Sequence, residues 1–360
     1  MVNKNAIFKR LKEYMEIHGI SGFEEDVIQA IKKNTKDANV EFARDGLNSL
    51  IITKKNHNKG PKILLAAHVD EVGFRVLDIN DNGQILVSAV GGVWPLVFIG
   101  TKAKLISSTN KEFYGIFGHT SIHILEAEKR LKAPTIKDMY VDFGFKNKKQ
   151  AQSQGIEPGD RIYVHGETMR LFNPDLVAGK AMDNRAGVTV LDFVVNSLKN
   201  EQLPNIPYFV GTTQEEVGTR GAKVIANWIN ADVAIVIDTG ASHDTLNAMK
   251  GIPAVGKGVA ITMMDFETII NTELVKIFFD LAKKHDVPIY KYVAQGGGTD
   301  AAELQYGKRG VPTISISIPQ RYLHSPIGVA SLNDIKNCIK LISEFYKVFD
   351  AKMLESIRKK

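Results

Sequence analysis

The chain has 360 residues, of which 44% are hydrophobic and 24% charged, and its formal net charge is +6. This length is enough for one large domain or two ordinary domains with a substantial core. No apolar run approaches the roughly 20 residues that cross a bilayer, and residues 1–19 lack the apolar core of a signal peptide. The basic residues are scattered and lack the interleaved aromatic residues of a single-stranded nucleic-acid surface, so we expect neither a membrane nor a nucleic-acid partner.

The sequence contains one cysteine, Cys338. A single thiol excludes an internal disulfide framework and is typical of a reducing compartment. Cys338 lies in an apolar helical pattern, which indicates an inert thiol in the core. We therefore expect a cytoplasmic protein.

The N-terminal part of the sequence predicts two helices followed by three strands. The helices are expected over residues 7–17 and 21–33, and the first two strands over 40–43 and 49–53. Ser21 and Glu24 have the spacing of a capping box at the start of the second helix. The continuous apolar run 63–67 predicts a strand buried on both faces, and it leads directly into His68 and Asp70.

The pattern changes between residues 72 and 164. Short alternating stretches are separated there by turn signals such as Asn80-Asp81-Asn82-Gly83, and helical periodicity is nearly absent outside 148–154. We therefore expect a small β-rich domain inserted into the main domain. Its strands are expected over 74–79, 84–89, 102–106, 113–117, 139–143 and 161–164.

After Pro174 helices and strands alternate. The expected helices cover 183–198, 222–229, 272–285, a segment after 300, and 332–352; the expected strands cover 208–212, 233–237, 254–261, 289–293 and 313–318. Such alternation implies an α/β fold with a mostly parallel sheet covered on both faces. Ligands of such sheets bind at the carboxyl ends of the strands.

Residues that can bind a metal ion follow several of these strands. They are His68 and Asp70, Asp183 at a helix start, the adjacent Glu215 and Glu216, Asp238, and His324. His68 and Asp70 project to the same side of a strand, where a carboxylate can orient an imidazole ligand. Asp183 alone could be a helix N-cap, Asp238 a turn former and His324 a structural histidine. Separate structural explanations would require five independent coincidences at strand ends, so a shared site is favoured.

The chemistry of these residues favours a catalytic metal centre. Imidazole and carboxylate ligands without a thiolate suit Zn, Co or Mn in a catalytic site. Two metal ions about 3.5 Å apart share a bridging carboxylate and a water molecule. Glu215 and Glu216 can then divide the work, one as a ligand and the other as the general base for the water.

Several segments resemble the dinuclear aminopeptidases of the glutamyl and deblocking aminopeptidase family, whose members form large tetrahedral assemblies. The segments are HVDEVGF, GKAMDNRAG, QEEVGTRGA, the strand ending in Asp238, GGGTDAA and the Tyr322…His324-Ser325-Pro326 end, in order between about Ser21 and Pro326. The resemblance implies a three-layer α/β/α peptidase domain over 1–71 and 165–360. It also implies an inserted β-barrel-like dimerisation domain over 72–164.

The resemblance also implies roles for individual residues. The metal ligands would be His68, Asp183, Glu216, Asp238 and His324, with Asp183 as the bridge, His68 and Asp238 in one site, and Glu216 and His324 in the other. Asp70 would orient His68, Glu215 would be the general base, and the peptide bond after Asp183 would be cis. The substrate pocket would involve Gly297, Gly298, Thr299 and Asp300, although a flexible loop is the simpler interpretation of the glycine run.

The function implied by the resemblance is removal of the N-terminal residue from peptides with a free N-terminus. Two divalent metal ions per subunit, Zn, Co or Mn, would be the cofactors, and a homo-oligomer such as a tetrahedral dodecamer would be the assembly. The alternatives are another metal-dependent amide hydrolase (a deacylase or carboxypeptidase) and a non-catalytic metal-binding assembly protein. An endoglucanase is discounted, because that chemistry uses a carboxylate pair without metal.

Two further groups of residues stay outside the predicted centre. His119 and His123 lie four apart in the β-rich region without a nearby carboxylate pattern, and we expect a non-catalytic loop there. Lys257, Lys308 and Arg309 could form a cationic pocket for an acidic first residue. Solvated surface charge is the alternative for these three.

Overall fold

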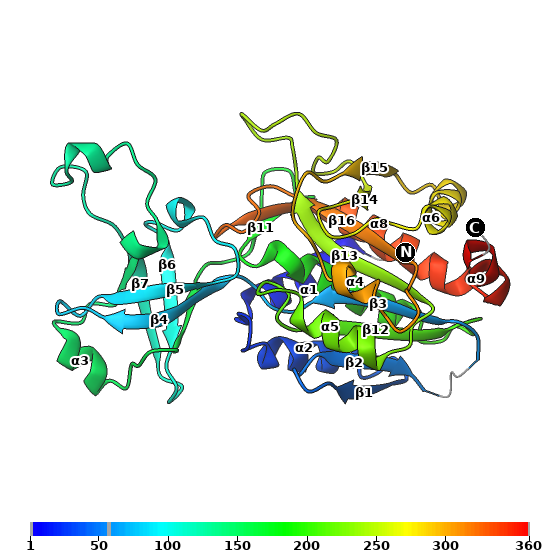
Figure 1. The fold of residues 1–360 in the computed structure, drawn as a ribbon, viewed down its shortest axis with the longest axis horizontal. Coiled ribbons are helices and arrows are strands. Elements are labelled where there is room, and N and C mark those ends of the chain that lie inside the picture. Colours follow the sequence, from blue (N-terminus) through cyan, green and yellow to red (C-terminus); the bar gives the residue numbers. More distant parts are fainter. Residues whose placement is uncertain (1–2, 56–58, 359–360) are drawn as a thin grey trace.

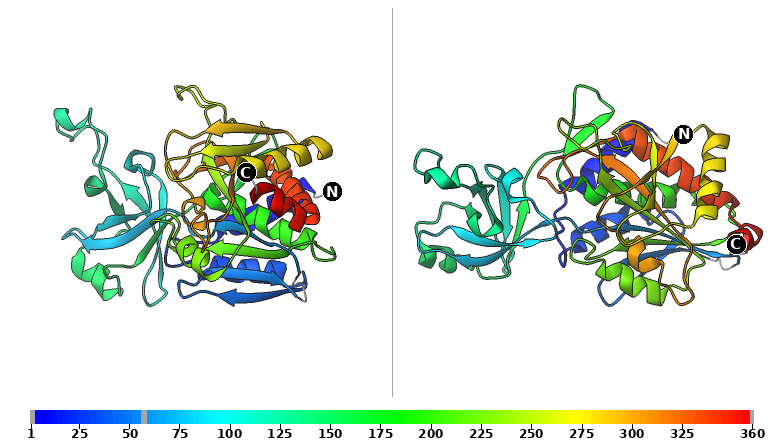
Figure 2. Two further views of the ribbon diagram at one scale, coloured as in Figure 1. Left: turned by 45° about the vertical axis from the view of Figure 1, so that its right-hand side comes forward. Right: turned by 45° about the horizontal axis from the view of Figure 1, so that its top comes forward.

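The computed structural model describes residues 3–55 and 59–358. It consists of a large α/β body and a smaller β-barrel that projects from one side of it (Figure 1). The two further views show the same separation, with the chain crossing between the bodies at a narrow junction (Figure 2).

A mixed sheet of eight strands runs through the large body, counted over the described residues. Its order is β1 (Val40–Arg44), β2 (Leu50–Lys54), β12 (Ile206–Thr212), β3 (Lys62–His68), β13 (Val233–Ala241), β16 (Thr313–Gln320), β14 (Val259–Met264) and β15 (Ile289–Val293). The four inner strands β12, β3, β13 and β16 are mutually parallel. Antiparallel pairs lie toward the two edges, at β1–β2, β2–β12 and β14–β16. The centre of the sheet is therefore parallel, as the alternation of helices and strands predicts.

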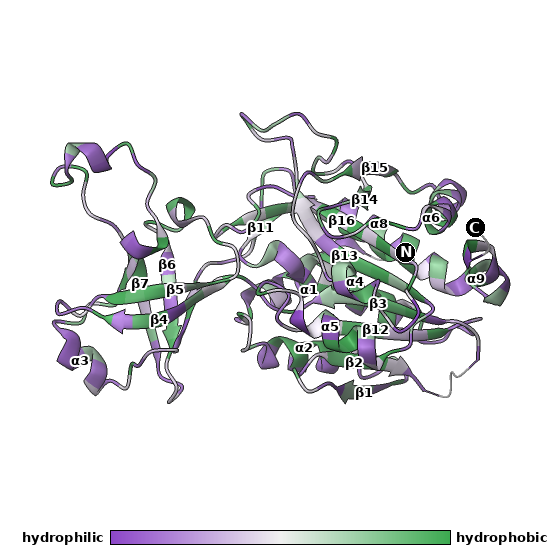
Figure 3. Cartoon of the chain, in the orientation of Figure 1, coloured by the Kyte–Doolittle hydropathy of each residue, from purple (hydrophilic) through white to green (hydrophobic). Residues whose placement is uncertain are grey.

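Alternate residues of β3 pack into cores on opposite faces of this sheet. Ile63 and Leu65 belong to one hydrophobic cluster, and Leu64 and Ala66 belong to another. Helices on the first face are α1 (Lys4–Glu16), α2 (Glu25–Thr35), α4 (Met182–Ser197), α6 (Thr272–His285), α8 (Leu332–Val348) and α9 (Ala351–Arg358); those on the second are α5 (Arg220–Trp228) and α7 (Ala301–Leu304). The body is a three-layer α/β/α fold, with hydrophobic strands at the centre of the ribbon (Figure 3).

The projecting body is a closed barrel of six strands within the described part of the chain. Its order is β4 (Gly73–Ile79), β5 (Ile85–Val90), β8 (Tyr140–Asp142), β7 (Glu112–Gly118), β6 (Lys102–Ile106) and β9 (Arg161–Val164), and α3 (Lys148–Ser153) lies outside it. Phe74, Phe98 and Phe117 fill its interior, with ring centroids 4.9–5.9 Å apart. The insertion therefore has its own core and forms the barrel that the resemblance implied.

Some expectations need correction. The expected helix 332–352 is two helices, because the chain turns at Asp350, whose Oδ1 accepts the Met353 N–H at 2.9 Å. The expected strand 254–261 begins only at Val259, after a turn in which the Gly256 and Gly258 N–H groups donate to Asp334. A three-stranded sheet was not anticipated; it comprises β10 (Met169–Arg170), β11 (Leu176–Gly179) and β17 (Gly328–Ser331).

The predicted capping box at Ser21 is wrong. Helix α2 starts at Glu25, and the Ser21 hydroxyl donates instead to Asp70 Oδ2 at 2.6 Å. Glu24 accepts the backbone N–H of Gly22 at 2.7 Å.

Two other expectations concern helices. Cys338 is fully buried in α8, as its apolar pattern indicates. Across the described residues no helix has both the length and the apolar character needed to cross a membrane.

Candidate active site

The residues singled out from the sequence gather at the carboxyl ends of the central parallel strands. His68 is the last residue of β3, Glu215 and Glu216 follow β12, and His324 follows β16. Asp238 differs from expectation, because β13 does not end there but continues to Ala241. Strand β13 continues because it stays paired with β16, from Asp238 opposite Ser317 to Ala241 opposite Gln320.

Asp183 lies at the centre of the cluster and faces both imidazoles. Its Oδ1 is 3.0 Å from His68 Nε2, and its Oδ2 is 3.2 Å from His324 Nε2. Asp238 Oδ1 is 3.4 Å from His68 Nε2, and Glu216 Oε2 is 3.5 Å from His324 Nε2. The candidate ligand atoms thus form two groups, each within 4.8 Å, that share Asp183: one with His68 and Asp238, the other with Glu216 and His324.

Both imidazoles are oriented by contacts at Nδ1. His324 Nδ1 lies 2.7 Å from the carbonyl oxygen of Gly92, to which it donates. His68 Nδ1 lies 3.2 Å from the carbonyl oxygen of Asp70 and 3.4 Å from its Oδ1. A proton held at Nδ1 leaves the Nε2 lone pair directed at the carboxylates, which is how histidine is prepared as a ligand.

Asp70 also fixes the loop that carries the two glutamates. Its Oδ1 accepts the Glu215 N–H at 3.0 Å, and its Oδ2 accepts the Glu216 N–H at 3.1 Å. Burial opposes the charged form of Asp70, but the contacts with His68 and the hydrogen bond from Ser21 outweigh it and lower the pKa. Asp70 therefore supports the glutamates as well as His68, a role that the sequence did not suggest.

The cluster concentrates negative charge out of solvent. Burial, reinforced by Asp183, raises the pKa of Glu216 to about 8, and burial raises that of Asp238 to about 6. The pKa of Glu215 is raised well above its ordinary value, first by burial. Buried Glu216 Oε1 has no hydrogen-bond partner among the described residues.

Several carboxylate oxygens lie close together around two imidazole nitrogens, and bound cations would relieve the repulsion between their charges. The donor set is that of hard to intermediate metal ions, with nitrogen and oxygen atoms and no sulfur. The residues therefore suit divalent metal ions.

The backbone is unusual at three loops of the cluster. Ala181, Gln214 and His324 are non-glycine residues in the left-handed region, with φ of 52°, 57° and 52°. Residues in such conformations concentrate at functional sites. The peptide bond between Asp183 and Asn184 is cis, as the resemblance implied. The Asn184 side chain donates to the Ile237 carbonyl oxygen at 2.8 Å and so ties this loop to β13.

A buried ion network lies behind the cluster, and sequence reasoning missed it. Lys180 Nζ is 2.8–2.9 Å from both carboxylate oxygens of Glu71, and Arg185 Nη2 is 3.3 Å from Oε1 of the same residue. Lys180 and Arg185 flank Asp183 in sequence, whereas Glu71 follows His68 and Asp70. The network therefore joins the two segments that carry the candidate ligands His68 and Asp183. Its signal in the sequence was the charged residues Glu71, Lys180 and Arg185 within the motifs HVDEVGF and GKAMDNRAG.

Two of the cavities that adjoin the cluster are lined by the glycine loop. A cavity of about 570 Å³ reaches Asp238, and one of about 350 Å³ reaches Glu215, Glu216 and His324. Gly297 and Gly298 line both of them.

The other residues expected near the substrate are placed differently. Thr299 lines the larger cavity, whereas Asp300 is buried beneath the loop and accepts a hydrogen bond from Thr212. Lys257, Lys308 and Arg309 line neither cavity; they are exposed, and Lys257 donates to the Ile252 carbonyl oxygen at 3.1 Å. His119 and His123 lie exposed between β7 and η2 (Ala127–Lys129) of the barrel body.

Comparison with known proteins matches this arrangement to one family. Residues 48–341 match the model of the M42 glutamyl aminopeptidases. The glutamyl aminopeptidase of Lactococcus lactis is 32% identical over 330 residues, covering 91% of this chain and 92% of that protein.

Solved structures show the same relationship. The TET aminopeptidase of the marine sediment archaeon Thaumarchaeota archaeon SCGC AB-539-E09 superposes with a TM-score of 0.93 at 32% identity, over 98% of this chain and 99% of that one. The Pyrococcus horikoshii TET1 peptidase, which can assemble into a tetrahedron or a large octahedral shell, has a TM-score of 0.86 at 29% identity, over 95% and 100%. These matches do not favour a deacylase, a carboxypeptidase or a non-catalytic protein. The chain belongs to the M42 glutamyl aminopeptidase family, and it is a peptidase of the aminopeptidase type.

Proposed function

We propose that the chain removes N-terminal residues from peptides with a free N-terminus, using two divalent metal ions. His68, Asp183 and Asp238 would hold one ion, and Asp183, Glu216 and His324 the other. The observation that carries the proposal is the position of Asp183, which presents one oxygen to each imidazole at 3.0 and 3.2 Å. Zn, Co and Mn all suit this donor set.

The metal ions, when bound, would polarise the scissile carbonyl and lower the pKa of a water molecule. Glu215 lines the cavity beside Glu216 and His324 and is assigned to no metal ion. We assign it the proton transfers: it takes the proton from the attacking water and returns it to the nitrogen of the leaving amine. Asp70 holds both Glu215 and His68 in place through the contacts described above.

We further propose the biological setting. Residues 1–71 and 165–360 would form the peptidase domain, and residues 72–164 a barrel that mediates dimerisation within a homo-oligomer, a tetrahedral dodecamer being the expected form. Support comes from the self-contained barrel core and from the assemblies of the TET1 peptidase. The single buried cysteine agrees with a reducing cytoplasm.

The test is hydrolysis of aminoacyl p-nitroanilides by enzyme stripped with a chelator and then given Zn, Co or Mn. The panel contains Glu, Asp, Leu and Lys derivatives and an N-acetylated control. Cleavage of free-amine substrates that depends on added metal, with the acetylated control left intact, is the expected result. Release of acetate from the acetylated control would indicate a deacylase, and no cleavage with any metal would reject the proposal.

A further inference from the structure

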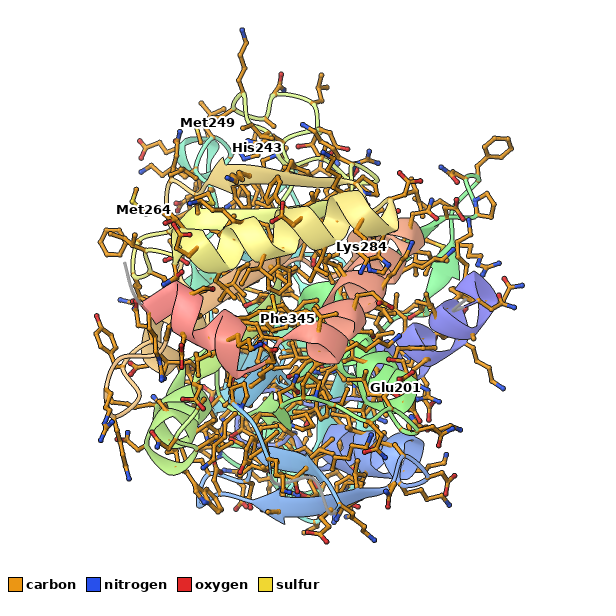
Figure 4. All side chains as sticks on the ribbon, turned by 90° about the vertical axis from the view of Figure 1, so that its right-hand side faces the viewer. Glu201, His243, Met249, Met264, Lys284 and Phe345 are labelled. Carbon is orange, nitrogen blue, oxygen red and sulfur yellow. The ribbon has the colours of Figure 1, made fainter. Side chains whose placement is uncertain are left out.

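The larger cavity has walls of two kinds. Met249, Ile252 and Leu323 contribute apolar surface, whereas residues such as Thr239, Asp265 and Tyr292 contribute hydroxyl and carboxylate groups. Figure 4 shows His243 and Met249 near each other beyond the sheet edge at β15, and His243 Nδ1 lies 2.8 Å from the Met249 carbonyl oxygen. Asp238 also lines this cavity, so one end of the cavity reaches the candidate metal centre.

Asp265 is the acid of this cavity that lies outside the metal-ligand groups. It follows β14 directly and is only 9% exposed. One oxygen, Oδ1, accepts the N–H groups of Glu267 and Thr268 at 2.8 and 2.7 Å. The other oxygen, Oδ2, accepts no hydrogen bond from the described residues. Asp265 is therefore a nearly buried carboxylate that lines the cavity with half of its acceptor capacity unused.

Hydroxyl groups continue this polar wall. Thr262 Oγ1 donates to Tyr292 Oη at 2.8 Å. The hydroxyl groups of Ser317 and Tyr292 both lie beside Gly240, where a Cβ atom would contact them. Thr239, 8% exposed, also lines the cavity, and its Oγ1 has no partner among the described residues. These groups accept hydrogen bonds readily, so they suit a ligand that donates them.

The other charged groups near the cavity do not neutralise the negative charge of Asp265. Lys250 stands at the exposed rim and forms no ion pair within the described residues. His243 has one ring nitrogen engaged with the Met249 carbonyl oxygen. The charge of Asp238 would be offset by a metal ion under the proposed function. A charge in a sheltered position is screened less than one at the rim, so Asp265 dominates the interior.

We infer that this cavity receives the side chain of the substrate's N-terminal residue and selects a basic one, lysine or arginine, through Asp265. The apolar wall would cover the methylene stem, and the cationic head would reach Asp265 Oδ2 and the neighbouring hydroxyl groups. The inference rests on the proposed function, since it names the substrate class of that same site. Asp265 is a specificity-determining residue here and takes no part in the bond cleavage.

The experiment compares p-nitroanilides of lysine, arginine, norleucine and glutamate on the metal-loaded enzyme, together with calorimetric binding of free L-lysine and L-norleucine. Norleucine matches the lysine stem without its charge. We expect kcat/KM for lysine to exceed that for norleucine at least about tenfold, as a hydrogen bond to a charged group implies. Asp265→Asn should bring kcat/KM for lysine to within about twofold of that for norleucine, because asparagine keeps the oxygen that accepts the two backbone N–H groups but loses the negative charge.

Lys250→Met is the matched control, and it should leave the lysine advantage in place. A wild-type preference for norleucine or glutamate would overturn the inference, as would an Asp265→Asn variant that loses all substrates equally. Binding of L-lysine over L-norleucine that depends on Asp265, without hydrolysis of any substrate, would support the cavity assignment and reject the proposed function. Failure of both readouts would reject both.

Discussion

Asp70 contacts three residues of the candidate active site, His68, Glu215 and Glu216. Its two carboxylate oxygens accept the backbone N–H groups of Glu215 and Glu216, one each, and Oδ2 also accepts the Ser21 hydroxyl. Its Oδ1 is 3.4 Å from His68 Nδ1. One carboxylate therefore sets the position of an imidazole and of the two glutamates at once, which an amide of the same shape cannot do.

We predict that Asp70→Asn lowers metal affinity or activity by about 10- to 100-fold, the range for residues that support a metal ligand. The amide group replaces one acceptor oxygen with a donor, so either Glu215 N–H or Glu216 N–H loses its partner. Competition with a chelator measures the affinity. Ser21→Ala is the control: it removes one hydrogen bond and should cost about 1 kcal/mol of unfolding free energy with a smaller effect on metal binding. Unchanged metal affinity in Asp70→Asn would contradict the argument.

The proposed role of Glu215 differs from that of Glu216, and mutation can separate the two roles. Glu215→Gln keeps the shape of the side chain but removes its capacity to accept the proton of the water. We expect at least about a 10²-fold loss of kcat, the contribution of a general base. Metal content, measured by atomic emission, should stay at the wild-type level, whereas Glu216→Gln should lose metal. A fully active Glu215→Gln enzyme would show that the roles are assigned wrongly.

At the scale of elements, local sequence patterns predicted most of the fold. Segment 63–67 is apolar at every position because β3 is buried on both faces, and that run alone located His68. Helix Thr272–His285 and strand Ile289–Val293 have the predicted bounds, because amphipathic period and strand alternation are local properties. Strand β11 was missed because it is short and its pairing with β17 joins segments about 150 residues apart in sequence.

The parts of the site that could not be predicted depend on long-range contacts. Ser21 has the local spacing of a helix cap, but in the fold its hydroxyl donates to Asp70, which is 49 residues away in sequence. Gly92 belongs to the barrel segment, yet its carbonyl oxygen orients His324. The motifs located the proposed ligands because a family pattern marks them, whereas the supporting contacts have no fixed spacing in the sequence.

The contact between the barrel segment and the cluster of candidate ligands leads to a prediction at Gly91. This residue has φ of 82°, and a Cβ there would lie 2.9 Å from Val72 Cγ1 and 3.1 Å from Glu216 Cβ. Gly100 has φ of 81°, with nothing within 4 Å of its Cβ position. Both alanine variants should lose about 1–2 kcal/mol of unfolding free energy from the left-handed backbone. Only Gly91→Ala should also weaken metal binding, because only its methyl group presses on Glu216.

Calorimetric unfolding and chelator competition on both glycine variants test this link. Equal metal affinity in Gly91→Ala and Gly100→Ala would show that the barrel segment does not support the cluster. Weaker binding in both would mean that backbone strain alone disturbs the site.

At the scale of the whole molecule, the body that contains the barrel exposes apolar side chains to solvent. Several large apolar side chains are exposed on the strands and loops of this body: Trp94 (59%), Tyr114 (58%), Ile116 (53%), Ile122 (59%) and Ile124 (79%). A group of exposed apolar side chains is typical of a protein–protein interface. Tyr114 and Ile116 alternate with less exposed residues along β7, so they share its outer face.

We predict that Ile116→Lys converts the proposed homo-oligomer into smaller species, because an interface that covers Ile116 would have to bury an unpaired ammonium group. Sedimentation velocity measures the change, and Ile116→Val, which keeps an apolar side chain at the same place, should sediment like the wild type. All five proposed metal ligands and Glu215 come from one chain, so the smaller species should still cleave a short aminoacyl p-nitroanilide. An Ile116→Lys protein with the wild-type sedimentation coefficient would place the interface elsewhere. Dissociation with complete loss of cleavage would show instead that the active site needs the neighbouring subunit.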